Sequence, residues 1–383
     1  MDMKRSEKKL VLFGAGKIGR SFIGQLFSRS GFEVVFVDIS RKLVDELNRH
    51  REYKVVIKSD AGDEVLLIGN VRGICLSDSD LVINELASAT ISALSVGQQG
   101  LPDTLPVIAQ ALILRREEHG EWPLDFIIAE NMRNSDQYLA GELDRFLPDD
   151  YPLEKLVGLV ETSIGKMVPI MSLKDIEDDP LQVFAEPYDT LIVAKRGFKN
   201  PVPEVINLAP KENIKAWVDR KLFIHNLGHA TAAYLGFLKY PQAIYIYQVL
   251  SDPEIFETTR QTMLQSAEIL MALYPGEFTI VQLTEHIDDL LYRFRNRALG
   301  DTIFRVGCDL YRKLSPEDRL AAPIRSAISL NKPYNLIYNA LLAAVSFRAT
   351  DEKGDYFPSD VNFFSESLYG IDYILENICR LEC

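Results

Sequence analysis

The chain has 383 residues, of which 47% are hydrophobic and 25% charged, and its formal net charge is -13 at pH 7. This length is too great for one ordinary hydrophobic core and suits two domains, and the composition is not that of a disordered chain. The acidic balance argues against nucleic acid or an anionic membrane as a partner, because both require a basic face.

The amino-terminal stretch MDMKRSEKKLVLFGAGKIG has no signal-peptide shape, and no apolar run approaches membrane-spanning length. The cysteines form no C-x-x-C pair, which is typical of reduced thiols in a cytoplasmic protein. They are Cys75, Cys308, Cys379 and Cys383. The histidines have no zinc-ligand spacing to cysteines or carboxylates. We therefore expect a cytoplasmic protein without a catalytic metal.

The first half of the chain alternates strand-like and helical runs. Apolar runs predict buried strands at 10–16, 33–38, 81–86 and 124–131, and a short strand pair at 53–57 and 64–68. Helical spacing of apolar residues predicts helices at 17–31, 41–50 and 104–120. Such β-α-β alternation predicts an α/β fold, with a doubly wound parallel sheet of the Rossmann type.

Added strands follow the alternating region, and the rest of the chain is expected to be helical. Segments 156–162 and 181–195 have strand character, and the proline-rich segment 199–210 is a plausible domain junction. Helices are expected at 212–238, 253–273, 279–294 and 334–347. We predict a nucleotide-binding domain over 1–203 and a mostly α-helical catalytic domain over 204–383.

A glycine-rich turn separates the first strand from the first helix. It has the spacing G-x-G-x-x-G and comprises Gly14, Ala15, Gly16, Lys17, Ile18 and Gly19. Gly14 permits a tight turn, Gly16 lets backbone N–H groups approach a pyrophosphate, and Gly19 allows close packing of helix on sheet.

The second strand ends in Asp38, an acidic residue at the distance along the chain that dinucleotide-binding folds use. Its carboxylate can accept hydrogen bonds from both ribose hydroxyls of NAD and would repel the 2′-phosphate of NADP. Arg41 is a basic residue that could hold a 2′-phosphate instead. The alternative is an ordinary βα turn in which Asp38 caps the next helix.

Three polar side chains lie on one side of the predicted helix that contains Lys221, Asn226 and His229. On an α-helix, Asn226 lies about 140° and His229 about 80° from Lys221. Oxidation of an alcohol needs a base for the hydroxyl proton and donors for the developing oxyanion, and lysine can be the base if burial lowers its pKa. By spacing alone, a solvated lysine and a core histidine are the favoured explanation of the pattern.

Several motifs occur together and in order along the chain. They are G-A-G-x-I-G-R-x-F-I-G at 14–24, E-N-M at 130–132, R-K-L-F-x-x-N-x-G-H-A at 220–230, A-Y-L-G at 233–236, R-V-G at 305–307, R-K-L at 312–314 and D-R-L at 318–320. With these motifs the chain resembles the mannitol-1-phosphate 5-dehydrogenases, which belong to the polyol-specific long-chain dehydrogenases. The resemblance runs from about residue 9 to about residue 348.

The resemblance implies a role for four residues. Lys221 corresponds to the catalytic base, Asn226 and Asn131 to oxyanion donors, and His229 to a substrate-positioning histidine. Asn131 could also be a helix N-cap, since asparagine caps helices well. His225 lies on the same arc of the helix, where we expect a core histidine, and Asp219 is expected on a solvated face.

Two segments depart from the family pattern. Gly165-Lys166 stands where an Asp–Arg pair is common, and Arg297 follows Asn296 where proline is common. These changes leave the catalytic motif intact and bear on the identity of the substrate.

A basic cluster lies in the last third of the chain. It comprises Arg305, Arg312, Lys313 and Arg319. Arg305 and Arg312 share a face if 305–313 is one helix, and arginine forks suit phosphate oxygens. The alternative is a surface helix whose cations pair with Asp309, Glu317 and Asp318.

We therefore expect an NAD-dependent, metal-independent oxidoreductase, a monomer or small homo-oligomer, that interconverts D-mannitol 1-phosphate and D-fructose 6-phosphate. Alternatives are a hexuronate reductase acting on fructuronate or tagaturonate, an unphosphorylated mannitol 2-dehydrogenase, and a dinucleotide sensor without turnover.

Overall fold

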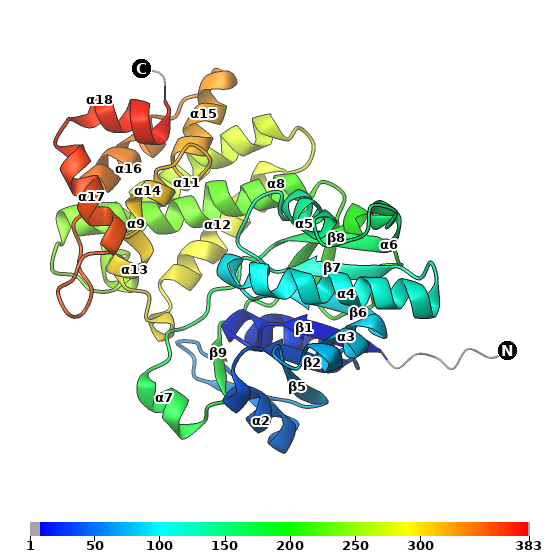
Figure 1. Cartoon of the computed structure of the whole chain (residues 1–383). Coiled ribbons are helices and arrows are strands. Elements are labelled where there is room, and N and C mark those ends of the chain that lie inside the picture. Colours follow the sequence, from blue (N-terminus) through cyan, green and yellow to red (C-terminus); the bar gives the residue numbers. More distant parts are fainter. Residues whose placement is uncertain (1–7, 382–383) are drawn as a thin grey trace. The chain divides into compact units, whose positions relative to one another are not determined.

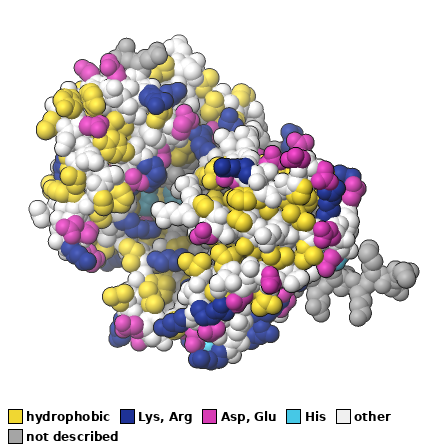
Figure 2. Space-filling view, viewed as in Figure 1, with side chains coloured by type: hydrophobic (Ala, Val, Ile, Leu, Met, Phe, Trp, Pro, Cys, Tyr) yellow, Lys and Arg dark blue, Asp and Glu magenta, His cyan; other side chains and the backbone are white. Residues whose placement is uncertain are grey.

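The computed structural model describes residues 8–381. The chain divides into two compact units, Met1–Trp217 and Val218–Cys383, which we describe separately (Figure 1). Figure 2 shows hydrophobic side chains interspersed with basic and acidic ones on the visible face of each unit. None of the helices in the described part of the chain is long and apolar enough to cross a membrane.

The first unit is built on an eight-stranded sheet in the order β11-β10-β8-β7-β6-β1-β2-β5. The strands are β1 (Lys9–Phe13), β2 (Glu33–Asp38), β5 (Val71–Cys75), β6 (Ile91–Leu94), β7 (Leu124–Ile128), β8 (Val157–Ser163), β10 (Leu191–Ala194) and β11 (Leu208–Lys211). Neighbouring strands are parallel except β8 and β10, which are antiparallel. The expected doubly wound parallel sheet is confirmed.

Side chains that alternate along each strand fill two cores, one on each face of this sheet. Leu10 and Leu12 of β1 pack with Phe22 in one core, whereas Val11 and Phe13 pack in the other. This alternation follows from the two-residue period of a strand. The helices of the unit are η1 (Gly19–Gly24, a π-helix), α1 (Gln25–Arg29), α2 (Arg41–His50), α3 (Ser79–Ala87), α4 (Leu101–His119), α5 (Ser135–Asp144), α6 (Leu153–Leu156) and α7 (Leu173–Asp178), with 3-10 turns at Gln98–Gly100 and Lys195–Gly197.

A second, three-stranded sheet has the order β4-β3-β9. The expected pair β3 (Tyr53–Ile57) and β4 (Glu64–Ile68) is antiparallel, and β9 (Val183–Ala185) joins β3 in parallel. Val55 and Val183 pack into the same core as Leu10, so this small sheet covers part of one face of the main sheet.

The strand predicted at 81–86 is wrong, because these residues lie in helix α3. Val82 and Leu86, one helical turn apart, are buried, whereas Leu81 is 60% exposed. The run is short, and its apolar residues fit a buried strand as well as one face of a helix. The strands on either side of α3 along the chain, β5 and β6, were not predicted.

The second unit consists of helices. They follow α8 (Ile214–Arg220) and are η4 (Lys221–Asn226, a π-helix), α9 (Leu227–Lys239), α10 (Ile246–Val249), α11 (Pro253–Leu273), α12 (Ile280–Phe294), α13 (Ile303–Gly307), α14 (Leu310–Lys313), α15 (Ala321–Ser329), α16 (Asn335–Val345), α17 (Pro358–Ser367), α18 (Ile371–Ile374) and η6 (Leu375–Cys379, a π-helix), with a 3-10 turn at Arg297–Leu299. Helix α9 packs against α11, α13 and α16 and is buried along most of its length. The expected mostly helical character of this half is confirmed.

The two units divide at residue 217, later than the boundary expected at residue 203. Strand β11 explains the difference, since it pairs with β10 and adds residues 208–211 to the sheet of the first unit. The proline-rich segment before β11 therefore connects two strands of that sheet.

Candidate active site

The glycine turn adopts the backbone geometry that its sequence predicts. Gly14 has φ +93°, and a Cβ atom there would collide with the carbonyl oxygen of Ser95. A Cβ atom on Gly19 would collide with the carbonyl oxygen of Gly14, so this glycine allows the first helix to start against the turn. A Cβ atom on Gly16 would meet nothing within 4 Å. Packing within the protein therefore requires glycine at positions 14 and 19 and leaves space at Gly16.

Asp38 connects the end of β2 to the glycine turn. Its carboxylate accepts hydrogen bonds from the backbone N–H of Ala15 at 2.8 Å and of Ser40 at 2.9 Å. The N-cap of α2 is Ser40, whose hydroxyl accepts from the N–H of Leu43. The alternative in which Asp38 is the cap of that helix is therefore wrong.

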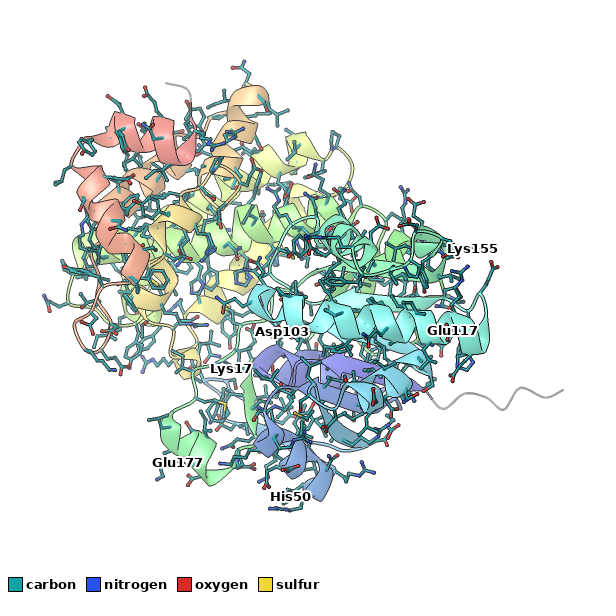
Figure 3. The ribbon with its side chains drawn as sticks, viewed as in Figure 1. Lys17, His50, Asp103, Glu117, Lys155 and Glu177 are labelled. Carbon is teal, nitrogen blue, oxygen red and sulfur yellow. The ribbon has the colours of Figure 1, made fainter. Side chains whose placement is uncertain are left out.

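Arg20 supports the glycine turn from inside the protein, a role that the sequence did not reveal. Its guanidinium is buried and donates to the carbonyl oxygens of Ala15 at 2.7 Å and Leu181 at 2.6 Å. Lys17, by contrast, is exposed. Figure 3 shows Lys17 on the side of the first unit where α4 begins near Asp103.

Glu130, which belongs to the E-N-M motif, binds the backbone of a neighbouring loop in the first unit. Its carboxylate accepts from the backbone N–H groups of Val96 at 2.8 Å and Gly97 at 3.1 Å, in the loop that follows β6. Asn131 is exposed shortly after the end of β7. It does not cap α5, because the N-cap residue of that helix is Asn134.

These features fit a dinucleotide. The helix N-terminus after the turn presents N–H groups, the space at Gly16 admits a pyrophosphate, and Asp38 lies at the carboxyl end of the second strand. In open parallel sheets, ligands bind at the carboxyl ends of the strands.

The helix that carries the predicted catalytic residues is not a regular α-helix. Residues Lys221–Asn226 form a π-helix, in which the N–H of Leu227 donates to the carbonyl oxygen of Leu222. Such i→i+5 bonding places residue i+5 about one turn after residue i, on the same side. Lys221 and Asn226 are therefore closer in direction than the 140° separation expected for an α-helix, and π-turns are frequent at functional sites.

The surroundings of Lys221 depress its basicity. Burial, together with the positive charges of Arg319 and Arg312, lowers its pKa to about 8, whereas Asp318 opposes the shift. These charged groups belong to the same unit as Lys221. A lysine with this pKa is partly neutral near physiological pH and can accept a proton.

His229 is held by an aromatic ring and a carboxylate. Its ring stacks on Phe294 with centroids 4.4 Å apart, and its Nε2 lies 3.4 Å from Oδ2 of Asp301. His225 is buried, as expected for a core histidine, and burial together with Arg293 holds its pKa well below the usual range. The sequence offered no signal for Phe294 or Asp301 as partners of His229, since they lie far along the chain.

The basic cluster does not lie on one helix, which corrects that expectation. Helix α13 ends at Gly307 and α14 begins at Leu310, because Asp309 between them has φ +71°. A Cβ atom on Gly307 would also collide with the ring of Phe347.

Each cation of this cluster has a partner within the second unit. Arg305 pairs with Asp301, and Arg312 contacts Asp309 at 2.5 Å and Asp318 at 3.3 Å. Arg319 contacts Asp318 at 2.7 Å. The side chains of Arg305 and Arg312 are 50% and 48% exposed.

Lys313 differs from the three arginines because it is buried. Its Nζ donates to the carbonyl oxygen of Val306 at 2.6 Å, and burial lowers its pKa to about 7. Its amino group therefore joins α14 to α13.

Three further residues discussed in the sequence analysis, Lys166, Asp219 and Arg297, have defined contacts in the structure. Lys166 is buried and donates to the carbonyl oxygens of Glu186 at 3.0 Å and Tyr188 at 2.6 Å. Asp219 was expected on a solvated face, but it is buried and accepts a hydrogen bond from the hydroxyl of Tyr274 at 2.5 Å. Arg297 lies over the ring of Tyr247, 5.6 Å from its centroid.

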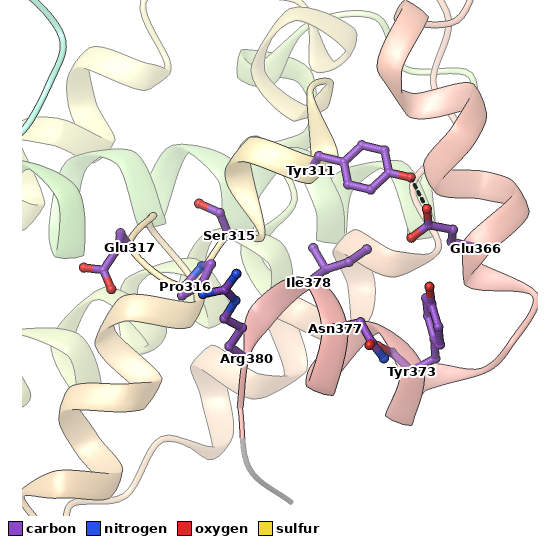
Figure 4. A pocket seen from close by; sticks show the side chains of 9 residues that line it. All are labelled: Tyr311, Ser315, Pro316, Glu317, Glu366, Tyr373, Asn377, Ile378 and Arg380. Carbon is purple, nitrogen blue, oxygen red and sulfur yellow. Dashed lines mark hydrogen bonds between the residues drawn. The ribbon is translucent and has the colours of Figure 1, made fainter.

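The second unit has a cavity of about 510 Å³ that is separate from the predicted catalytic residues (Figure 4). Its lining residues come from α14, the turn after it, α17, α18, η6 and the residue after η6, and are Tyr311, Ser315, Pro316, Glu317, Glu366, Tyr373, Asn377, Ile378 and Arg380. Figure 4 shows the hydroxyl of Tyr311 directed at Glu366, to which it donates at 2.8 Å.

The described residues contain no group of three or more His, Cys, Asp and Glu that could hold a metal ion. Cys75, Cys308 and Cys379 are free thiols, and Cys383 lies outside the described residues.

The doubly wound sheet, its glycine turn and the acidic end of β2 define a Rossmann-type dehydrogenase. The model of the mannitol dehydrogenase Rossmann domain matches residues 8–207, and that of the mannitol dehydrogenase C-terminal domain matches residues 213–367. The chain belongs to the mannitol dehydrogenase family and is an oxidoreductase.

Solved structures of two dehydrogenases have a similar fold. A D-sorbitol dehydrogenase in substrate-free form has a TM-score of 0.78 at 16% identity, over 97% of this chain and 90% of that one. A mannitol 2-dehydrogenase from Pseudomonas fluorescens, in a ternary complex with NAD and D-mannitol, has a TM-score of 0.71 at 18% identity, over 97% of this chain and 88% of that one.

Proposed function

We propose that this protein is an NAD-dependent polyol phosphate dehydrogenase that interconverts D-mannitol 1-phosphate and D-fructose 6-phosphate, with Lys221 as the general base. The observation that carries this proposal is the state of Lys221, whose pKa is lowered to about 8 within a π-turn that aligns it with Asn226. A base with a pKa near the working pH combines a useful neutral fraction with good proton affinity.

The chain's own residues account for the proton and the oxyanion. Nζ of Lys221 takes the proton of the substrate hydroxyl, and in the reverse direction it returns that proton to the carbonyl oxygen. The side-chain amide of Asn226 donates a hydrogen bond to the same oxygen while it carries negative charge, and Asn131 corresponds to a second such donor in the family that the sequence resembles. When bound, the nicotinamide accepts hydride from the alcohol carbon or returns it to the ketose.

His229 orients the substrate in this scheme. Stacking on Phe294 and the contact with Asp301 restrict its ring, so that a nitrogen can bind a neighbouring hydroxyl in a fixed direction. Fixed orientation of the substrate contributes to the rate because the reacting atoms must be aligned.

The glycine turn and Asp38 would hold NAD. Backbone N–H groups at Gly16 and at the start of the first helix would bind the pyrophosphate, and Asp38 would accept from the ribose hydroxyls. The presence of NAD in the structurally similar mannitol 2-dehydrogenase supports this choice.

The phosphate group of the substrate would bind to the basic cluster. Arg312 and Arg319 influence the pKa of Lys221, so their charges lie near the proposed base. Arg305 and Arg312 are the more exposed members, and a phosphate could share them with Asp301, Asp309 and Asp318. Lys313 is buried and would support this cluster indirectly, by joining helices α13 and α14.

We expect alcohol oxidation to depend on pH through Lys221. Only the neutral amine accepts a proton, so kcat/KM for the polyol should rise with pH and level off above about 8. Ketose reduction needs the protonated amine and should fall over the same range. Initial rates of NADH formation and consumption, measured between about pH 6 and 10, test this, and equal rates across that range would contradict it.

A substrate panel tests the proposed function. We expect NADH oxidation with fructose 6-phosphate and little with fructose, fructuronate or tagaturonate. Arg312→Ala should raise KM for fructose 6-phosphate by about tenfold, since one arginine–phosphate contact is lost. Arg260→Ala is the matched control, because Arg260 is also paired, with Asp288 at 2.7 Å.

Any other outcome of the substrate panel would indicate one of the alternative functions. Activity on fructose alone would indicate an unphosphorylated mannitol 2-dehydrogenase, and activity on the uronates a hexuronate reductase, whose carboxylate would also suit the cluster. NADH binding without turnover of any of the four compounds would indicate a dinucleotide sensor.

A further inference from the structure

Arg41, the first residue of α2, is bound by a carboxylate of the first unit. Its two terminal nitrogens lie 2.6 and 2.8 Å from the two oxygens of Asp78, in a bidentate pair. The hydroxyl of Ser77 accepts a third hydrogen bond from the guanidinium at 3.0 Å. The three contacts fix both the position and the plane of the guanidinium.

This arrangement lies at the carboxyl ends of two neighbouring strands. Asp38 ends β2 and pairs in register with Cys75, the last residue of β5. Arg41 follows Asp38 at the start of α2, and Asp78 follows Cys75 in the next turn. The ion pair therefore spans the ends of β2 and β5, beside the carboxylate that would contact the ribose.

An arginine at this place has a known chemical use. In dinucleotide-binding folds, an arginine near the end of the second strand holds the 2′-phosphate of NADP. Its planar fork matches phosphate oxygens. Here the same fork is already occupied by Asp78, whose pKa is lowered by its hydrogen bond from Arg41, so the carboxylate stays charged at neutral pH.

We propose that Asp78 is a specificity-determining residue that keeps Arg41 from binding a 2′-phosphate, so that two carboxylates, Asp38 and Asp78, jointly select NAD over NADP. Asp38 acts directly by repulsion, and Asp78 acts by holding the guanidinium. Ser77 assists Asp78 by accepting from the same nitrogen. The inference rests on the dinucleotide binding of the proposed function and does not depend on the identity of the polyol.

The energetic balance favours a measurable effect. Arg41 and Asp78 are 52% and 33% exposed, and such pairs contribute little to folding, so their separation should not unfold the protein. A 2′-phosphate must nevertheless compete with a preformed bidentate partner. Removal of the charge of Asp78 leaves the arginine and Ser77 in place for the phosphate.

The test compares binding of NADH and NADPH to the purified protein by fluorescence titration without any polyol. The variants are Asp78→Asn, Asp38→Ser, the double variant, and the double variant with Arg41→Ala. We expect Asp78→Asn alone to tighten NADPH binding about threefold, and about tenfold in the Asp38→Ser background. Addition of Arg41→Ala to the double variant should abolish the gain that Asp78→Asn gives in the Asp38→Ser background.

Asp150→Asn is the matched control, because Asp150 is an exposed acid paired with Arg116 at 3.1 Å in the same unit. It changes the net charge equally and should leave NADPH binding unchanged. Equal NADPH affinity with and without Asp78, or a gain that persists without Arg41, would overturn the inference. Failure of the wild-type protein to bind NADH would instead count against the proposed function.

Discussion

Replacement of Lys221 with alanine is expected to lower kcat by about 10²–10⁴, the range for loss of a positioned general base, and to leave NADH binding unchanged. The reason is that Lys221 carries the proton of the substrate hydroxyl, whereas the glycine turn and Asp38 carry the cofactor. Single-turnover rates of NADH oxidation with fructose 6-phosphate, together with NADH titration, separate the two effects.

Lys215→Ala is the control for this variant. Lys215 lies on α8, shortly before Lys221 in sequence, and is exposed, so its loss should change neither rate nor binding. A rate within about threefold of wild type in the Lys221 variant would reject the lysine as base.

Two glycine substitutions in the same turn should have opposite consequences. Gly19→Ala introduces a methyl group against the carbonyl oxygen of Gly14, so we expect a loss of about 1–3 kcal/mol in the free energy of unfolding. Gly16→Ala meets no protein atom within 4 Å, so stability should be retained. The methyl group would instead occupy the space proposed for the pyrophosphate, and NADH affinity should fall by at least about tenfold.

Urea denaturation and NADH titration of both variants measure this pair. Gly31→Ala is a useful reference for backbone strain, since Gly31 has φ +85° with nothing near its Cβ position and lies at the far end of the first helix. Wild-type NADH affinity in the Gly16 variant would contradict the proposed placement of the pyrophosphate.

Much of the fold was predictable because its signals are local. The strand at 33–38 and the helix at 41–50 were predicted with their observed bounds, since an apolar run ending in Asp38 and the helical spacing of apolar residues are clear signals. The strand predicted at 81–86 is wrong because these six apolar and polar residues fit either a strand or one side of a helix. Only the tertiary burial of Val82 and Leu86 decides between them.

The sequence predicted candidate residues for the site but not the side chains that contact them. Lys221, Asn226 and His229 were proposed from a sequence motif, but the partners of His229 are distant in sequence: Phe294 ends α12, and Asp301 lies in the segment before α13. Arg20 and Glu130 were parts of motifs whose hydrogen bonds to backbone depend on loops elsewhere in the chain. Such partners require the folded arrangement, which spacing along one element does not contain.

The widened turn at Lys221–Asn226 changes how base and donor pairs should be sought in helical sequences. On a regular helix the residue stacked one turn after Lys221 would be His225, a core side chain. The extra residue in this turn brings Asn226 to that position. A search restricted to partners four residues apart would overlook this pair, and a transfer of the motif to a designed straight helix would need one residue fewer between lysine and asparagine.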